Sequence, residues 1–323
     1  MKQSLNESIK QAAEEIRGAN KVVIVSHVNP DGDTIGCQLA LGLALIMIGK
    51  KVTLLCQDPI PTRFQFLPGS ELILSQSTEI ADVAIAMDCG SAKQLGKIRP
   101  IFSRAKKTIQ IDHHDFGIAF AKLLVLEEDA SAVGEIVYEL IRALKFKITP
   151  AIATCLLTSI IVDTGSFRFS NIRPKTFDIC GKLIKEGVDL QQLIEASYWQ
   201  KSRVTAKLSG HCMLNAQFSK DGSIAWVTVY QRDFKNFGAI LSDVDPVADD
   251  LRSIEGVKIA AVFRETVGRR FRVSLRAAYG INVAVVAKIF GGGGHHNAAG
   301  CVIRNSQKER QRLLDELGAL ITQ

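Results

Sequence analysis

The chain has 323 residues, of which 47% are hydrophobic and 23% are charged, as in soluble globular proteins that bury a substantial core. This length favours two domains over one. The longest apolar run, residues 39–48, is too short to cross a bilayer, so the sequence excludes a membrane-spanning chain. The net charge of +7 favours an anionic partner such as phosphate or nucleic acid.

The cysteines and the first residues indicate where the protein works. The seven cysteines are dispersed, and none forms a Cys-x-x-Cys pair, which favours a reducing cytosol over a disulfide framework. Residues 1–20 are polar and charged, with apolar side chains at helical spacing. We therefore expect a surface helix there and not a signal peptide. Both observations predict a cytoplasmic protein.

Polar side chains follow the first predicted strand, residues 21–26, whose sequence KVVIVS is apolar and β-prone. The loop that comes next carries His27, Asp31 and Asp33. Asp33 or Thr34 is predicted to cap the helix that follows. One imidazole and two carboxylates within a single turn suit a divalent cation. The alternative is structural, in which Asp31 stabilises the turn and Asp33 caps the helix.

The same pattern recurs at the ends of two later strands. Residues 81–87 form an apolar strand that Asp88 ends, and residues 108–111 form another. The second of these strands is followed directly by three polar residues, Asp112, His113 and His114. Because the carboxyl ends of parallel strands meet at one edge of a sheet, we expect these side chains to lie close together. A solvated turn is the alternative for the histidines, but the recurrence favours a site for Mn²⁺, Mg²⁺ or Zn²⁺.

Helices complete the first predicted domain. Residues 130–144 carry apolar side chains at positions i, i+3 and i+4, and a buried helix over residues 150–162 runs into Asp163. Asp163 is a further acid at the end of a buried element, where a C-terminal cap is the alternative role. The predicted fold is therefore α/β, with a mainly parallel sheet flanked by helices in a domain of residues 1–195.

The pattern changes in the last third of the chain. We expect a linker over residues 196–215 and a smaller α/β domain over residues 216–323, with strands near 223–230, 258–264 and 271–276. The last strand alternates, so that its polar face carries Arg270, Arg272, Ser274 and Arg276. A row of arginines suits phosphate, because the guanidinium group binds oxyanions through two hydrogen bonds. A solvated outer face of the sheet is the alternative.

A glycine run follows the next predicted helix, residues 281–290. Gly291–Gly294 are consecutive glycines, followed by His295 and His296. Glycines let a backbone approach a ligand closely and present its N–H donors. A nucleotide P-loop is excluded, because neither a Walker lysine nor a Gly-x-Gly-x-x-Gly context is present. A flexible turn is the alternative.

Together these motifs resemble the DHH phosphoesterase family, which takes its name from an Asp-His-His sequence. Four motifs are similar to the family's metal-site motifs and have the same order: the loop with His27, Asp31 and Asp33, then Asp88, then Asp112-His113-His114, then Asp163. The glycine run with His295 and Ala298-Ala299-Gly300 resembles the DHH-associated C-terminal domain. The resemblance covers nearly the whole chain, and within the family it is greatest to the bacterial nano-RNases.

The resemblance implies a centre of two Mn²⁺ ions, for which Mg²⁺ or Co²⁺ can substitute. One ion would be held by His27, Asp31 and Asp88. The other would be held by Asp33, Asp88, His113 and Asp163, so that Asp88 bridges the two. Asp112 would orient a histidine ligand, and His114 would face the substrate phosphate. The implied catalytic residues are therefore Asp88, Asp112 and His114.

The resemblance also implies how the substrate binds. The implied binding residues are Arg276, His295, Gly293, Gly294 and Asn297, with the active site in the cleft between the two domains. The chain departs from the family's usual residues at three positions, Ala277 for Ser, Thr34 for Ala and Cys37 for Ser. None of these departures removes an expected metal ligand.

The expected activity is Mn²⁺-dependent hydrolysis of very short oligoribonucleotides, and of 3′-phosphoadenosine 5′-phosphate to AMP. The alternatives with the same chemistry are a phosphodiesterase for cyclic or linear dinucleotides (cyclic di-AMP, pApA) and a RecJ-like single-strand exonuclease. The sequence Gly291–Gly300 disfavours an inorganic pyrophosphatase. A rival of another class is a nucleic-acid-binding protein with a dead site, which the complete ligand set disfavours. The expected partners are the nucleotide substrates, no membrane is involved, and a homodimer is left open.

Overall fold

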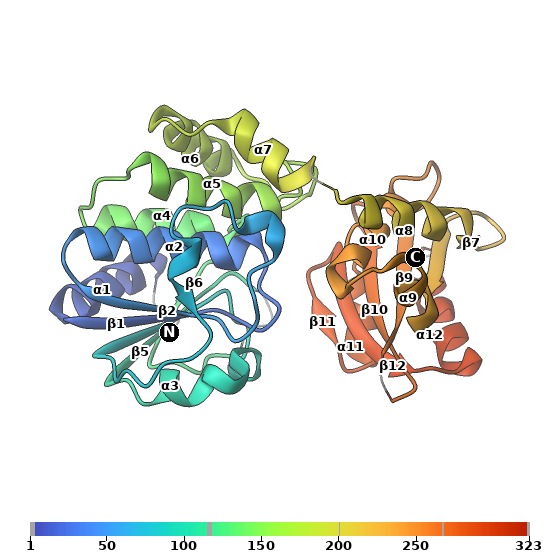
Figure 1. The fold of residues 1–323 in the computed structure, drawn as a ribbon, viewed down its shortest axis with the longest axis horizontal. Helices are drawn as coiled ribbons and strands as arrows, with labels where there is room; N and C mark the ends of the chain where they lie inside the picture. Colours follow the sequence, from blue (N-terminus) through green and yellow to red (C-terminus); the bar gives the residue numbers. More distant parts are fainter. Residues whose placement is uncertain (1–3, 115–117, 200, 267, 322–323) are drawn as a thin grey trace. The chain divides into compact units, whose positions relative to one another are not determined.

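The structure is a computed structural model that describes residues 4–114, 118–199, 201–266 and 268–321. The chain forms two compact units, residues 1–200 and 201–323, which Figure 1 shows in blue to yellow and in gold to red. Their boundary falls within the segment 196–215, for which a linker is predicted. That segment contains the end of helix α7 (Leu190–Tyr198) and all of α8 (Arg203–Leu214), so most of it is helical.

The first unit is built on a sheet of six parallel strands in the order β3-β2-β1-β4-β5-β6. The strands are β1 (Lys21–Val25), β2 (Lys51–Leu55), β3 (Ile73–Leu74), β4 (Val83–Met87), β5 (Lys107–Asp112) and β6 (Leu123–Leu126). The strand order reverses between β1 and β4. In sheets of this kind a ligand crevice opens at such a reversal, outside the carboxyl ends of the strands. The predicted parallel α/β fold is confirmed.

Helices cover both faces of this sheet, and this explains why its central strands are apolar throughout. The α-helices are α1 (Leu5–Gly18), α2 (Gly32–Met47), α3 (Arg99–Ser103), α4 (Val133–Ala143), α5 (Pro150–Asp163), α6 (Pro174–Lys185) and α7, and the 3₁₀ helices are η1 (Thr62–Phe64), η2 (Ser70–Leu72) and η3 (Ala92–Ile98). Figure 1 shows α2, α4 and α5 on one side of the sheet and α3 on the other. Ile24 and Ile85 face the first layer, whereas Val23 and Ala84 face η3 and α3.

The start of α2 differs from the prediction. The N-cap is Asp31, whose carboxylate accepts a hydrogen bond from the Thr34 backbone N–H at 3.1 Å. The prediction that Asp33 or Thr34 caps this helix is therefore wrong. Asp33 is already helical and points inward, where it is almost fully buried. The reason lies in the backbone, because an N-cap needs extended φ and ψ angles, which Asp31 has.

The second unit contains a mixed sheet in the order β11-β12-β10-β9-β8-β7, which is antiparallel except for the pair β8–β9. Its strands are β7 (Gln217–Phe218), β8 (Ile224–Val229), β9 (Ile259–Thr266), β10 (Arg270–Ala277), β11 (Gly293–Gly294) and β12 (Ala298–Arg304). Its helices are α8, α9 (Gln231–Phe237), η4 (Leu241–Val244), α10 (Val247–Arg252), α11 (Val283–Ile289) and α12 (Gln307–Ala319). The predicted strands and the helix before the glycine run are present, and β12 and α12 are additions to them.

The alternation predicted for β10 is confirmed. Phe271, Val273 and Leu275 are buried in a core that they share with α11 and α12. Arg270 and Arg272 on the other face are exposed. On that other face a second core joins β8 and β9 to α8 and α10.

Two further predictions concern membrane-spanning helices and the cysteines. Within the part of the chain that the structure describes, no helix combines the length and apolar character needed to cross a membrane. All seven cysteines are buried, and their thiols are free.

Candidate metal centre and substrate residues

The first unit brings the predicted metal ligands to one edge of its sheet. His27 lies two residues beyond β1, Asp88 follows β4, and Asp112 ends β5 just before the two histidines. The start of α2 adds Asp31 and Asp33 from the same side. The last residue of α5, Asp163, completes the cluster. Side chains at the ends of β1, β4 and β5 and on α2 and α5 therefore converge near the point where the strand order reverses.

One group in this cluster consists of His27, Asp31 and Asp88, whose potential ligand atoms lie within 4.8 Å of one another. The Nδ1 atom of His27 lies 2.8 Å from the carbonyl oxygen of Val28. A donor at Nδ1 leaves the lone pair of the neutral ring on Nε2. This Nε2 atom lies 3.5 Å from Oδ2 of Asp88, so the metal-binding nitrogen faces the carboxylate.

A second group consists of Asp33, His113 and Asp163, with potential ligand atoms again within 4.8 Å. Nδ1 of His113 lies 2.9 Å from the Ala130 carbonyl oxygen, which fixes the ring. Nε2 of His113 is 3.4 Å from Oδ2 of Asp163 and 3.9 Å from both Oδ2 of Asp33 and Oδ1 of Asp88. A single imidazole nitrogen thus faces three carboxylates.

Asp88 lies between the two groups. Its Oδ2 faces His27, and its Oδ1 faces His113. Oδ1 is buried and accepts no hydrogen bond from any residue that the structure describes, although Nδ1 of His114 lies 3.5 Å from it; a buried carboxylate oxygen without a hydrogen bond is costly. The backbone of Asp88 has φ = 54°, a strained conformation of the kind found at functional sites. Both facts fit a carboxylate that bridges two cations.

Asp112 and His114 form a pair beside this centre. Asp112 is fully buried, and its Oδ1 lies 2.7 Å from Nδ1 of His114. The same oxygen accepts the backbone N–H of His113 at 2.9 Å. Asp112 was expected to orient a histidine ligand of the metal, but the ring that it contacts is that of His114, which is not one of the expected ligands.

Burial and charge shift the pKa values of these groups in opposite directions. Burial lowers the pKa of His27, but Asp88 outweighs this and raises it to about 9. The pKa of His113 likewise rises to about 9, because Asp163 and Asp33 outweigh its burial. His114 rises to about 10, because its hydrogen bond to Asp112 outweighs burial. At neutral pH protonated histidines therefore balance the buried carboxylates.

The carboxylates themselves respond differently to the cluster. Burial, and then the charge of Asp88, raises the pKa of Asp33 to about 7. Burial also raises the pKa of Asp163 well above its usual value. Burial acts against Asp88 too, but its contact with His27 and the charges of the histidines keep its pKa below the ordinary range. Such a concentration of acids suits divalent cations, which can take over the role of the protons.

Three residues that support the cluster were missed as functional residues. The Thr34 hydroxyl donates to Oδ2 of Asp88 at 2.7 Å and lies 2.6 Å from Nε2 of His27. Ser159 and Cys37 donate to Oδ1 of Asp33 at 2.5 and 3.2 Å. Helical spacing held a signal for two of them, since Cys37 follows Asp33 by four residues, as Asp163 follows Ser159.

The predicted substrate residues lie together at one end of the second unit's sheet. Arg276 of β10 is paired in register with Ala298 of β12, next to Asn297, whose carbonyl accepts the Ala277 N–H at 2.9 Å. Nε of Arg276 donates to Oδ1 of Asp249 at 2.9 Å, an ion pair that sequence reasoning did not predict. It holds the guanidinium group in one orientation.

The glycine run has a structural reason as well as a predicted functional one. A Cβ atom at Gly292 would lie 2.0 Å from the Gly300 carbonyl oxygen, and one at Gly294 would lie 2.5 Å from that of Ala298. Gly294 also has φ = 137°, which side chains disfavour. The backbone N–H of His295 donates to the Ala298 carbonyl at 2.8 Å. These contacts pack the turn tightly against β12, so a flexible turn is not what the structure shows.

Comparison with protein families agrees with this geometry. Residues 21–160 match the model of the DHH family, N-terminal domain, and residues 224–323 match that of the DHHA1 domain. The chain therefore carries a DHH-family N-terminal domain followed by a DHHA1 domain. Its predicted class, a hydrolase that acts on phosphoester bonds, is thereby confirmed. The motifs quoted above lie within these two matches, except for Asp163, which lies just beyond the first.

Similar proteins cover nearly the whole chain. The bifunctional oligoribonuclease and PAP phosphatase NrnA of Thermus thermophilus is 29% identical over 98% of this chain and 95% of its own length. The cyclic-di-AMP phosphodiesterase GdpP of Geobacillus thermodenitrificans is 26% identical over 87% of this chain, but over only 44% of its own length.

Solved structures have the same fold. An exopolyphosphatase-related protein from Bacteroides fragilis superposes with a TM-score of 0.89 at 26% identity, covering 97% of this chain and 95% of that one. RecJ from Thermus thermophilus, in complex with Mn²⁺, superposes with a TM-score of 0.61 at 12% identity, covering 97% of this chain and 55% of that one. The second likeness concerns the fold alone.

Proposed function

We propose that this protein is a metal-dependent phosphoesterase that hydrolyses very short oligoribonucleotides and also converts 3′-phosphoadenosine 5′-phosphate to AMP. The observation that carries the proposal is the position of Asp88, a buried carboxylate with one oxygen toward each of two ligand groups. The similarity to NrnA over nearly the full length supports this choice of substrate. The free, buried cysteines support a cytoplasmic location.

The proposed cofactor is a pair of Mn²⁺ ions, with His27, Asp31 and Asp88 around one, and Asp33, Asp88, His113 and Asp163 around the other. Such a pair supplies a nucleophilic water and stabilises the negative charge that develops on a phosphoryl group. Carboxylate and imidazole ligands suit manganese. Mg²⁺ and Co²⁺ are the proposed substitutes.

The protein's own residues are proposed to position the substrate and to donate hydrogen bonds to it. Asp112 holds the ring of His114 through Nδ1 and raises its pKa to about 10, so His114 is a cation at neutral pH. A cationic imidazole donates a strong hydrogen bond to a phosphoryl oxygen. We propose this role for His114. In the second unit, Arg276, held by Asp249, is proposed to bind a further phosphate of the substrate.

The test is a parallel assay of the full-length protein with Mn²⁺. It compares an RNA dinucleotide, a long single-stranded RNA, 3′-phosphoadenosine 5′-phosphate and cyclic di-AMP. We expect the dinucleotide to have the highest kcat/KM, with measurable turnover of 3′-phosphoadenosine 5′-phosphate. A preference for cyclic di-AMP would favour the dinucleotide phosphodiesterase, and one for the long RNA would favour an exonuclease. RNA binding without any metal-dependent turnover would indicate a catalytically dead protein.

A further inference from the structure

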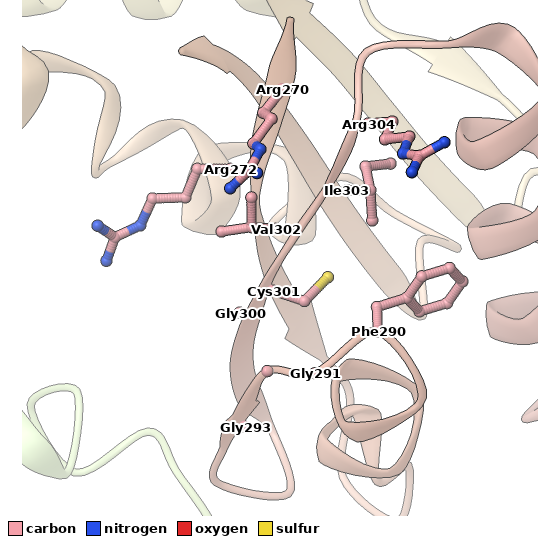
Figure 2. Close-up of a pocket in the computed structure, with 11 residues that line it drawn as sticks. Arg270, Arg272, Phe290, Gly291, Gly293, Gly300, Cys301, Val302, Ile303 and Arg304 are labelled. Carbon is pink, nitrogen blue, oxygen red and sulfur yellow. The ribbon is translucent and has the colours of Figure 1, made fainter. Parts of the chain in front are cut away.

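The second unit contains a pocket of about 570 Å³ that the predicted substrate set does not explain. It is lined by β10, β12 and the segment that joins α11 to β11. Figure 2 shows the arginines along the upper part of the two strands, with Phe290 and the glycine segment below them. Of the predicted substrate residues, Gly293 lines this pocket, whereas Arg276, His295 and Asn297 do not.

Positive charge is concentrated on one side of the pocket. Arg270 and Arg304 are directly opposite each other in the register of β10 and β12, and Arg272 is two residues further along β10. Residues two apart on a strand, and residues opposite each other, share a face of the sheet. No ion pair with an acidic residue neutralises these arginines in the described parts of the chain. Like charges opposite each other are unfavourable, so this arrangement favours an anionic ligand.

A fourth arginine, Arg264, is affected by the same positive charge. Arg264 of β9 is opposite Arg272 in the register. Its own burial, and then the charge of Arg272, lowers its pKa. The positive charge therefore extends across three neighbouring strands.

The backbone adds hydrogen-bond donors to the pocket. The Asn305 N–H donates to the Arg269 carbonyl and the Ala277 N–H donates to that of Asn297. These bonds fix which residues of β12 pair with β10. In an antiparallel pair the bonded residues alternate, so Val302 and Arg304 direct their N–H groups away from β10.

The edge of the sheet is open at this point. β11 pairs with β12 only at Gly293–Gly300 and Gly294–Ala299, so the part of β12 beyond Gly300 borders the pocket. An open sheet edge with N–H donors, flanked by arginines, forms a concavity that suits anions. The open stretch, Cys301 to Arg304, is shorter than the most common strand length of about 5–6 residues. This favours phosphate groups over an acidic peptide.

We propose that the pocket is a second phosphate subsite, which holds the backbone of an RNA oligomer beyond the nucleotides bound near Arg276. Arg272 and Arg276 are four residues apart on β10, about 14 Å at the usual rise per residue. A dinucleotide that occupies the Arg276 end does not need the pocket, whereas an oligomer of several nucleotides does. The inference rests on the proposed function, because it adds a preferred RNA length to the proposed substrate class.

The test uses the full-length double variant Arg272→Ala/Arg304→Ala. The matched control is Arg232→Ala/Lys235→Ala, which removes the same charge from exposed positions of α9, away from the pocket. Binding of an RNA pentamer and an RNA dinucleotide is measured by calorimetry in chelator, and kcat/KM is measured for both with Mn²⁺. We expect the pentamer to bind about tenfold more weakly or worse in the pocket variant, since charge-assisted hydrogen bonds are lost. The dinucleotide and the control variant should be unchanged.

A lysine variant, Arg272→Lys/Arg304→Lys, separates charge from geometry and is expected to lose less pentamer affinity than the alanine variant. Equal loss for both RNA lengths, or no loss for either, would overturn the second subsite. So would stronger binding of a polyglutamate peptide than of the pentamer, which would indicate a peptide partner.

The proposed function fails separately from this inference. If the wild-type protein binds the pentamer but hydrolyses no RNA, the proposed activity is refuted. The comparison of pentamer binding between the wild-type protein and the pocket variant still tests the second subsite. If the wild-type protein hydrolyses the dinucleotide and the variant keeps its pentamer affinity, only the pocket is refuted.

Discussion

At the scale of single residues, the site depends on how each acid is held. Asp88 contacts both ligand groups, whereas Asp31 is at the same time the N-cap of α2. We therefore expect replacement of Asp31 and replacement of Asp88 to have different effects. Replacement of Asp31 should affect helix stability as well as metal binding, since loss of a cap costs about 0.5–2 kcal/mol. Replacement of Asp88 should affect both metal positions and leave the helix intact.

We predict that Asp88→Asn abolishes hydrolysis and lowers the content of bound metal at both positions. An amide keeps the shape of the side chain but removes the charge that two cations would share. Metal content by mass spectrometry and kcat with Mn²⁺ are the measurements, and Cys89→Ala, at a neighbouring buried position without a predicted role, is the control. Two bound metals per chain with full activity would refute the bridging role.

We predict that Arg276→Ala lowers kcat/KM by about ten- to a hundredfold. This loss corresponds to roughly 1.5–3 kcal/mol, the contribution of a charge-assisted hydrogen bond. The loss should be largest for 3′-phosphoadenosine 5′-phosphate and smallest for a minimal phenyl phosphodiester, which has no second phosphate. Metal content should not change, because no proposed ligand comes from the second unit. Asp249→Asn should reproduce part of the loss, since Asp249 orients the guanidinium group. Equal loss on both substrates would place Arg276 at the reacting phosphate or in the fold.

At the scale of elements, the sequence predicted what is local and missed what depends on distant contacts. A buried strand followed at once by Asp or His is a local pattern, so the ends of β1, β4 and β5 were predictable. The cap of α2 was not, because Asp33 turns inward to meet the backbone N–H of Val133 and the hydroxyl of Ser159, which are 100 and 126 residues away in the sequence. The strand β12 was missed because its run of small residues, Ala298 to Cys301, carries little β-propensity and depends on pairing with β10.

The packing of α2 against α5 is a further element-scale property, because both helices carry metal-site residues. A Cβ atom at Gly36 would lie 2.4 Å from the Cys155 carbonyl oxygen, so the two helices approach each other closely there. We predict that Gly36→Ala destabilises the first unit by about 1–3 kcal/mol through overpacking. Gly181→Ala in α6, where nothing lies within 4 Å, is the control. It should be neutral or stabilise by up to about 1 kcal/mol. Chemical denaturation measures both, and equal midpoints would contradict the close packing.

At the scale of the whole molecule, the core and the proposed metal centre are separable. The first unit has large buried cores on both faces of its sheet, while the ligands lie at the strand ends. Metal should therefore be needed for activity and not for folding, unlike in small metal-dependent domains. Circular dichroism of the protein in chelator should show an unchanged fold with loss of hydrolysis. Global unfolding in chelator would contradict this separation.

Metal binding by the whole protein should also release protons. His27 and His113 have pKa values raised to about 9, and Asp33 to about 7, so at pH 7 both histidines, and part of Asp33, carry protons. A nitrogen or oxygen must lose its proton before it binds a cation. We therefore predict that affinity for Mn²⁺ rises as pH increases from 6 toward about 9 and then levels off, as these groups deprotonate. Titration calorimetry in two buffers of different ionisation enthalpy would measure the protons released. Arg276→Ala should release the same number, and His27→Gln fewer. An affinity for Mn²⁺ that does not change with pH would exclude these histidines as ligands.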